Sequence, residues 1–159
     1  MARRIIFALL ALAATACQPA PPPEISLPGA RPIAYDAIRD ASGVLGFAEP
    51  LLGPEFGKNY STRVGPGSSR LDATAVAGAW ELPLTTTTNE VAQSLRGLGT
   101  LDDVRDYRDG SIWIADYRTP GSQAVRLLLI DGTNRAFETK AALEVRPGPH
   151  IYLIAYRKP

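Results

Sequence analysis

The last third of the chain consists of short apolar runs separated by turn residues, and no other feature limits the possible folds as strongly. Residues 111–118, 124–131 and 150–157 are rich in β-branched and aromatic side chains, with glycine, proline and aspartate between the runs. This pattern predicts strands joined in antiparallel order. A further strand, with or without a break, is predicted between residues 137 and 146. We therefore expect an antiparallel meander or β-sandwich over residues 111–159.

The predicted strands are apolar on both faces. Ile112 and Ile114 alternate with Trp113 and Ala115, so neither side of this strand is polar, and residues 127–130 repeat the pattern. Strands of this kind need cover on both sides, because an uncovered apolar face would stay in contact with water. The cover is expected from a second sheet or from a helix that precedes the strands.

The spacing of apolar residues, together with glycine and proline, defines the elements ahead of this region. Thr88 or Asn89 has a side chain suited to capping the start of a helix. The predicted elements are, in chain order, a short helix over 33–42, irregular structure over 44–60, a strand within 71–84, a helix over 89–98 and a helical turn over 101–106. The sequence thus predicts an α+β or mainly β fold, with one or two short helices before the C-terminal sheet and a single domain over residues 33–159.

The first residues have the composition of a secretory signal. Arg3 and Arg4 supply positive charge, and an uncharged apolar run follows from residue 5 to residue 14. The run is too short to cross the ~30 Å of a bilayer's hydrocarbon core. Ala14-Thr15-Ala16-Cys17 resembles the lipobox of bacterial lipoproteins, in which cleavage falls just before the cysteine and its sulfur carries a diacylglycerol.

This resemblance implies that residues 1–16 are a signal peptide, that Cys17 is lipidated, and that the mature protein is anchored to the bacterial envelope. Gln18 stands where aspartate favours retention in the inner membrane, so the resemblance favours the outer membrane, on its periplasmic face. The alternative is an ordinary secretory peptide, cut elsewhere, that leaves Cys17 as a free thiol. Proline-rich residues 17–32 are expected to form an extended tether or, alternatively, a recognition ligand for a partner domain.

Charge and length narrow the possible partners. Arg3 and Arg4 leave with the signal peptide, so 15 of the 17 basic residues remain against 16 acidic ones. A net charge near −1 creates no field that would attract nucleic acid. No apolar stretch after the leader approaches the ~20 residues of a transmembrane helix. The remaining length is enough for one hydrophobic core.

One spacing near the C-terminus resembles a known module. Ile130-Asp131-Gly132, a variable arm with Phe137, and the segment from Val145 to Ile151 resemble the Asp-Gly … Pro-Gly-x-His arrangement of PEGA-like small β-sandwich modules in envelope lipoproteins. The shared residues are mostly those of turns, where Gly132 and Gly148 allow the chain to reverse. The resemblance implies a structural or binding module and not an enzyme.

No group of residues has the spacing of a catalytic or metal site, and we expect no cofactor. His150 is the single histidine. One histidine without partner residues is too few to activate a nucleophile or to hold a zinc ion, and we expect it to make a hydrogen bond at a turn. Four aspartates lack the spacing of a calcium loop and are predicted on a solvated helix face: Asp102, Asp103, Asp106 and Asp109. A carboxylate pair for glycoside chemistry would require the fold to bring together two of five acids: Glu81, Glu90, Asp116, Glu138 and Glu144.

Aromatic residues provide a candidate binding surface. They could line a ligand groove, although core positions are the more common use of such side chains: Trp80, Trp113, Tyr117, Tyr152 and Tyr156. We expect a non-enzymatic accessory or scaffold subunit that is held at the membrane and binds another envelope protein, through loops or by strand addition. The alternatives are a carrier of lipid or glycan, with a cavity between sheet and helix, and, with least support, a hydrolase.

Overall fold

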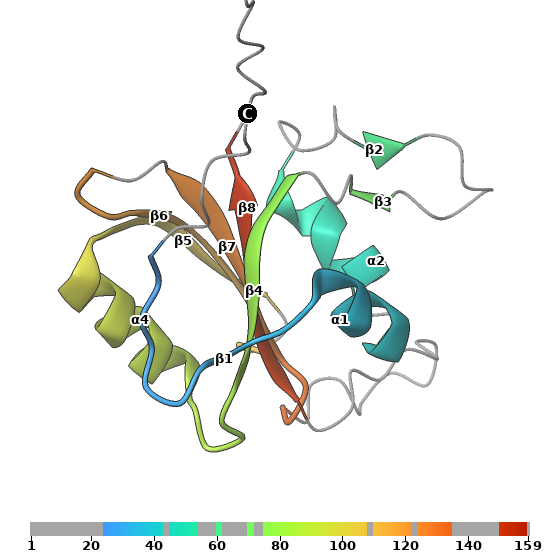
Figure 1. Cartoon of the computed structure of the whole chain (residues 1–159), viewed down its shortest axis with the longest axis horizontal. Coiled ribbons are helices and arrows are strands. Elements are labelled where there is room, and N and C mark those ends of the chain that lie inside the picture. The colour runs from blue at the N-terminus through green and yellow to red at the C-terminus, as the bar shows by residue number, and fades with distance from the viewer. Residues whose placement is uncertain are drawn as a thin grey trace, which may run out of the picture.

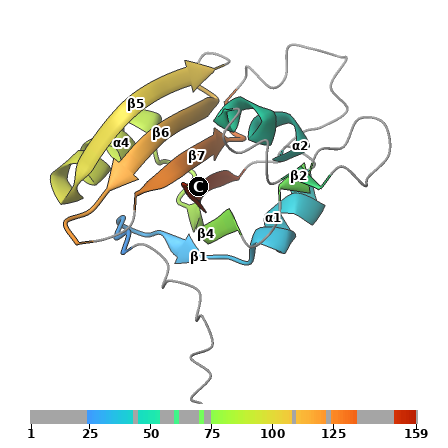
Figure 2. The same cartoon turned by 90° about the horizontal axis from the view of Figure 1, so that it is seen from above.

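Antiparallel pairing of the C-terminal strands produces a six-stranded sheet at the centre of the molecule (Figure 1). The structure is a computed structural model that describes residues 24–42, 45–53, 60–61, 70–71, 75–107, 110–121, 124–134 and 150–158. The strands of this sheet lie in the order β1 (Arg31–Pro32), β4 (Val76–Leu82), β8 (Ile151–Arg157), β7 (Val125–Asp131), β6 (Ile112–Arg118) and β5 (Thr100–Tyr107). Figure 2 shows this order across the sheet. A separate two-stranded sheet pairs β2 (Tyr60–Ser61) with β3 (Arg70–Leu71).

The C-terminal meander predicted from the sequence is confirmed. Strands β5, β6, β7 and β8 are consecutive neighbours in one sheet, and every pair is antiparallel. The strand predicted within 71–84 is β4, which pairs with β8 and ends at Leu82, just before Pro83. The strand predicted between residues 137 and 146 lies outside the described residues. The α+β or mainly β class is therefore confirmed.

Helices cover both faces of the sheet. In Figure 1, α4 (Thr88–Leu98) lies on one side, and α1 (Tyr35–Ser42) and α2 (Leu45–Ala48) lie on the other, followed by the 3₁₀ helix η1 (Glu49–Leu52). The α4 core comprises Leu82, Val91, Leu95, Trp113, Ala115, Tyr117, Val125, Leu127, Leu129, Ile151, Leu153 and Ala155. The α1 core comprises Ile38, Leu45, Ala48, Leu52, Ala75, Ala79, Ile112, Ile114, Leu128, Ile130, Tyr152, Ile154 and Tyr156. Of the two kinds of cover that the sequence allowed for this sheet, the described residues supply helices.

The helical turn predicted over residues 101–106 is wrong, because this segment is strand β5. Leu101 and Val104 have the i, i+3 spacing of a helix, yet a β-bulge interrupts the pairing with β6 between Asp102 and Arg105. Asp103 within the bulge has a positive φ of 47°. The bulge inserts an extra residue, so two apolar residues three apart can lie on the same face of a strand. Pairing with β6 thus overrides a pattern that is helical in isolation.

Residues 45–52 also differ from the prediction of irregular structure. They form α2 and η1, which bring Leu45, Ala48 and Leu52 into the α1 core. Pro50 falls in the first turn of η1, where its missing N–H has no intrahelical partner to lose. Residues 54–59, which complete the predicted irregular segment, lie outside the described part of the chain.

Residues 25–32 belong to the folded domain, although the tether was predicted to extend to Pro32. Ile25, Leu27 and Ala30 pack against the α4 core. Arg31 and Pro32 form β1, the edge strand that pairs with β4. The apolar side chains among the prolines explain the difference, because burying them against α4 stabilises a segment whose proline content alone favours an extended chain.

One buried ion pair interrupts the apolar face toward α1. Arg126 on β7 is buried, and its Nε donates to Asp116 Oδ1 on β6 at 2.8 Å. Its Nη1 donates to the carbonyl of Leu52, the last residue of η1, at 2.5 Å. Lys158 Nζ donates to the second Asp116 oxygen at 2.5 Å. Arg126 therefore connects the sheet to the end of the helical layer above it, where helix carbonyls lack intrahelical donors.

We expect Arg126→Ala to lower the free energy of unfolding at neutral pH by about 3 kcal/mol, because it leaves Asp116 and the Leu52 carbonyl without their buried donor. The control is Arg118→Ala, an exposed residue of the neighbouring strand, which should change this free energy by less than about 0.5 kcal/mol. Urea unfolding of the mature chain, followed by circular dichroism, measures both. Equal effects of the two variants would contradict a structural role for Arg126.

The same pair makes stability depend on pH. Burial raises the pKa of Asp116, but hydrogen bonds from Arg126 and Lys158, and their charges, outweigh burial and lower that pKa below its ordinary value. The contribution of the ionised carboxylate is therefore complete above an aspartate's ordinary pKa of about 3.9. It is lost as the pH falls through the lower pKa of the folded state. We expect the difference in stability between wild type and Asp116→Asn to shrink over this acidic range.

Candidate functional site

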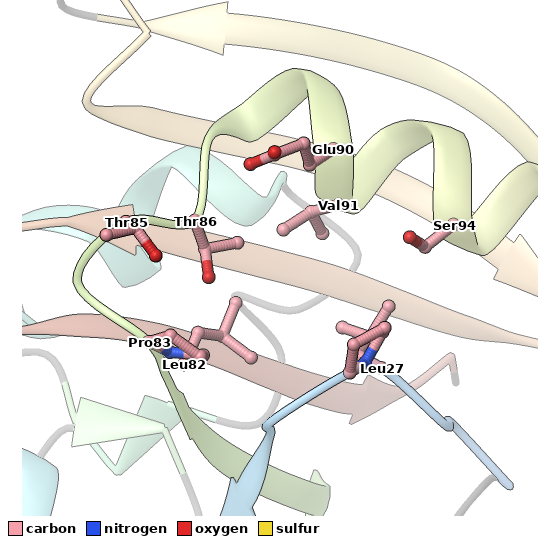
Figure 3. A pocket seen from close by; sticks show the side chains of 9 residues that line it. Leu27, Leu82, Pro83, Thr85, Thr86, Glu90, Val91 and Ser94 are labelled. Carbon is pink, nitrogen blue, oxygen red and sulfur yellow. The ribbon is translucent and has the colours of Figure 1, made fainter.

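A groove of about 350 Å³ lies between α4, the end of β4 and residues 25–30 (Figure 3). We call it the α4 groove. Its floor is apolar, since Leu82 and Val91 are buried members of the α4 core and Leu27 packs against them. In Figure 3, Val91 and Ser94 point from the helix toward Leu82 and Leu27. The rim carries polar side chains, namely Thr85, Thr86, Glu90 and Ser94.

Local sequence fixes the position of α4 at this groove. After β4, the N–H of Thr86 donates to the carbonyl of Pro83 at 2.9 Å and closes a turn. Thr87 then begins the helix with a capping box: its hydroxyl accepts from the N–H of Glu90 at 3.2 Å, and its own N–H donates to Glu90 Oε2 at 2.8 Å. The N-cap is thus one residue before Thr88, the earlier of the two predicted candidates.

The opposite wall is a tight turn of the N-terminal segment. The N–H of Ala30 donates to the carbonyl of Leu27 at 3.1 Å, and Gly29 between them has a φ of 71°. A Cβ atom on Gly29 would lie 2.8 Å from Cγ of Pro83. Glycine is needed here both for its backbone conformation and for its close approach to Pro83. The turn holds Leu27 and Pro28 at the mouth of the groove.

Among the described residues that line the groove, Glu90 is the single charged one. Its pKa is lowered first by the hydrogen bond from the backbone N–H of Thr87 and then by the Thr87 hydroxyl. The carboxylate is therefore ionised at neutral pH, but a lowered pKa makes it a weak general base. Ser94, one helical turn away, has no histidine or lysine beside it among the lining residues. The groove has the properties of a binding site for an apolar group with a donor near it.

The five aromatic residues predicted as a binding surface do not share one face. Trp113 and Tyr117 belong to the α4 core, and Trp80, which is partly buried, packs against this core. Tyr152 and Tyr156 belong to the α1 core on the other side of the sheet. All except Trp80 are buried. None of the five lines the α4 groove. Burial raises the pKa of the Tyr117 hydroxyl, and burial together with the charge of Glu81 raises that of Tyr152.

His150 makes hydrogen bonds at the start of β8, as the sequence predicts for a structural residue. Its carbonyl accepts from the N–H of Gly132 at 2.8 Å, its Nδ1 lies 2.8 Å from Glu81 Oε1, and its ring stacks on Tyr152. Arg31 also pairs with Glu81. The hydrogen bonds from Arg31 and then from His150 lower the pKa of Glu81. This cluster joins β1, β4 and β8 at the edge of the sheet.

The acidic residues considered for cation binding or catalysis have other surroundings. Asp102, Asp103 and Asp106 lie on strand β5 and not on a helix face, and Asp109 is outside the described residues. In the part of the chain that the structure describes, no three metal-ligating side chains come together. Three of the five acids considered for glycoside chemistry are described, and each hydrogen-bonds to a neighbour in the fold. Glu81 pairs with His150, Glu90 with Thr87, and Asp116 with Arg126. Glu138 and Glu144 lie outside the described residues.

Comparisons with protein-family models, with curated proteins and with solved structures gave no match. Within the described residues, no helix combines the length and the apolar character needed to cross a membrane.

The groove could not be read from the sequence because its walls are far apart along the chain. Leu27 and Pro28 stand in a proline-rich stretch, whereas Val91 and Ser94 stand in a helix. One signal was available, namely Ile25 and Leu27 at alternating positions followed by Gly29, which is typical of a short extended segment that packs and then turns.

We expect Gly29→Ala to destabilise the protein by about 1–2 kcal/mol, because it adds a side chain at positive φ and in contact with Pro83. Gly97→Ala is the matched control, since a Cβ at this helical position meets nothing within 4 Å. It should be neutral or stabilising by up to about 1 kcal/mol. Chemical unfolding measures the stability of both variants. An unchanged unfolding midpoint for Gly29→Ala would contradict the close contact between this turn and Pro83.

Proposed function

We propose that this chain is a lipid-anchored binding protein of the bacterial envelope, attached through Cys17, that captures another envelope protein and carries out no chemistry of its own. The observation that supports this most directly is the α4 groove, with an apolar floor and a polar rim. An open apolar space at the surface, ringed by polar groups, is typical of a site that receives an anchoring side chain.

The groove suits one large apolar side chain and its immediate neighbours. Its volume of about 350 Å³ is at the lower end of small-molecule sites. Leu82 and Val91 are already fixed by the α4 core, so binding would order few side chains of this protein. A leucine, methionine or phenylalanine of the partner would displace water from this floor, which stabilises the complex by burial of apolar area.

The rim of the groove determines which polar group of the partner can lie beside its apolar side chain. Glu90 lines the groove, and its Oε2 accepts both hydrogen bonds from Thr87, so Oε1 has no hydrogen-bond partner among the described residues. A lysine, an arginine or a free backbone N–H next to the partner's apolar residue fits this carboxylate. The proposed occupant is therefore a short segment of an envelope protein that carries an apolar residue beside a basic one.

The position of the groove agrees with an anchored binder. One wall is built by Leu27 and Pro28, which stand in the second half of the segment predicted as the tether, residues 17–32. A partner held in the groove would then lie close to the membrane end of the domain, and the length of the tether would limit how far from the bilayer it could be captured.

The test of the groove uses two tryptophan substitutions on the same helix. We expect Ser94→Trp to fill the groove and weaken binding of the partner at least about tenfold, because the partner's apolar side chain can no longer enter it. Gly97→Trp introduces the same ring on the same helix, at a position outside the groove lining whose Cβ would meet nothing within 4 Å, and should leave binding unchanged. A photoreactive residue at Thr86 in cells identifies the partner and the segment it contributes, and titration of the purified pair then gives the affinities.

Two results would contradict the proposal. One is equal binding by the Ser94→Trp and Gly97→Trp variants. The other is a crosslinked segment that contains no apolar residue.

The lipid anchor at Cys17 is tested separately. We expect the mature protein to begin at Cys17 with added acyl mass, and Cys17→Ser to move it from the membrane fraction to the soluble fraction, because two or more acyl chains hold a protein at a bilayer far longer than one. Mass spectrometry of the N-terminal peptide and fractionation of cells measure these. A mature chain that begins elsewhere, or that begins at Cys17 without acyl mass, would contradict the lipid anchor.

A further inference from the structure

A second and larger hollow lies on the other side of α4. It has a volume of about 610 Å³ and is bounded by the outer side of α4, the loop before it, strand β5, and the adjoining ends of β6 and β7. Trp113 contributes to its lining and is the one residue of the predicted aromatic surface that does so. The two spaces share only the threonines 85 and 86, so this hollow can be tested independently of the α4 groove.

Polar side chains from separate elements line this hollow without partners in the described part of the protein. Asn89, Gln93 and Arg96 come from α4, and Asp106 comes from β5. None of these four side chains makes a hydrogen bond or an ion pair with another described residue. Asp131 at the end of β7 accepts from the N–H and hydroxyl of Thr133 through Oδ1 alone. A ligand can therefore bind these side chains without breaking contacts among the described residues.

The set contains both donors and acceptors in close to equal number. Arg96 donates only, Asp106 and Asp131 accept only, and the side-chain amides of Asn89 and Gln93 do both. One cation against two carboxylates disfavours a phosphate or other anion. Two carboxylates fall short of the ligands that a divalent cation needs, in keeping with the lack of any metal-ligating group of three among the described residues. A neutral ligand with many hydroxyl groups matches this set best, because each hydroxyl both donates and accepts.

Apolar side chains stand beside the polar ones. Leu84 is 57% exposed and Val104 is 39% exposed, and both line the hollow. Exposed apolar groups of this size next to unpartnered hydrogen-bonding groups fit the two kinds of surface on a sugar ring, its C–H faces and its hydroxyl edges. We propose that this hollow binds a short neutral oligosaccharide. This is a second activity, separate from the capture of a protein segment in the α4 groove.

The experiment uses Trp113 as its reporter. The chain has two tryptophans, so in a Trp80→Phe background the emission comes from Trp113 alone. Cellotriose and chitotriose are added to the mature protein up to about 10 mM, a concentration that nearly saturates a site with a Kd of 1 mM. We expect one of these sugars to change the emission of Trp113 and to give a matching isotherm by calorimetry with the wild-type chain.

Variants connect the binding to the hollow. Asp106→Ala and Gln93→Ala should each raise the Kd roughly five- to tenfold, as expected for a lost hydrogen bond. Asp102→Ala is the matched control, because it removes the same side chain from the same strand but lies outside the hollow, and it should leave the Kd within about twofold. Absence of binding by both sugars, or binding that Asp106→Ala and Gln93→Ala leave unchanged, would overturn the proposal.

Discussion

A sheet that is apolar on both faces is the constraint from which the rest of this structure follows. In β6, β7 and β8, side chains toward α4 and side chains toward α1 are both buried, so each face must be covered. The segments before and between the strands supply that cover: α1, α2 and η1 on one side, α4 and residues 25–30 on the other. The helices are short, and the sheet holds them in place by burial.

The dimensions of that cover explain why surface hollows occur on the α4 side. Six strands about 4.8 Å apart make a sheet roughly 24 Å wide, whereas a helix with its side chains is about 10 Å across. One helix therefore cannot cover this face. Residues 25–30 fill part of the remainder next to β4 and border the α4 groove, while the larger hollow lies on the other side of α4, beside β5 and the start of β6. Both candidate binding sites thus lie beside a helix that is narrower than the sheet it covers.

The sequence predicts the parts of this fold that depend on local pattern. Strands β6, β7 and β8 and helix α4 follow from apolar runs and turn residues, although the N-cap of α4 is Thr87 and neither predicted candidate. Strand β5 was predicted as a helical turn because the bulge at Asp103 imitates helical spacing, and a bulge becomes visible only when β6 pairs with it. The candidate site was less predictable. Tyr117 and Tyr152 both looked available for a ligand, yet the sheet places them in opposite cores, since which face a residue occupies depends on the register of strands distant in sequence.

The edges of the sheet bear on how a partner could bind. Strand addition needs a long, flat edge with free backbone groups. At one edge β1 has two residues, and Pro32 lacks an N–H. At the other edge β5 is interrupted by its bulge and carries Asp102, Asp103 and Arg105 around it. Bulges, charges and proline are the features by which proteins prevent pairing at an edge, so the described edges disfavour strand addition. The side chains around α4 suit a partner better, because the apolar floor of the groove is fixed and Glu90 Oε1 has no hydrogen-bond partner among the described residues.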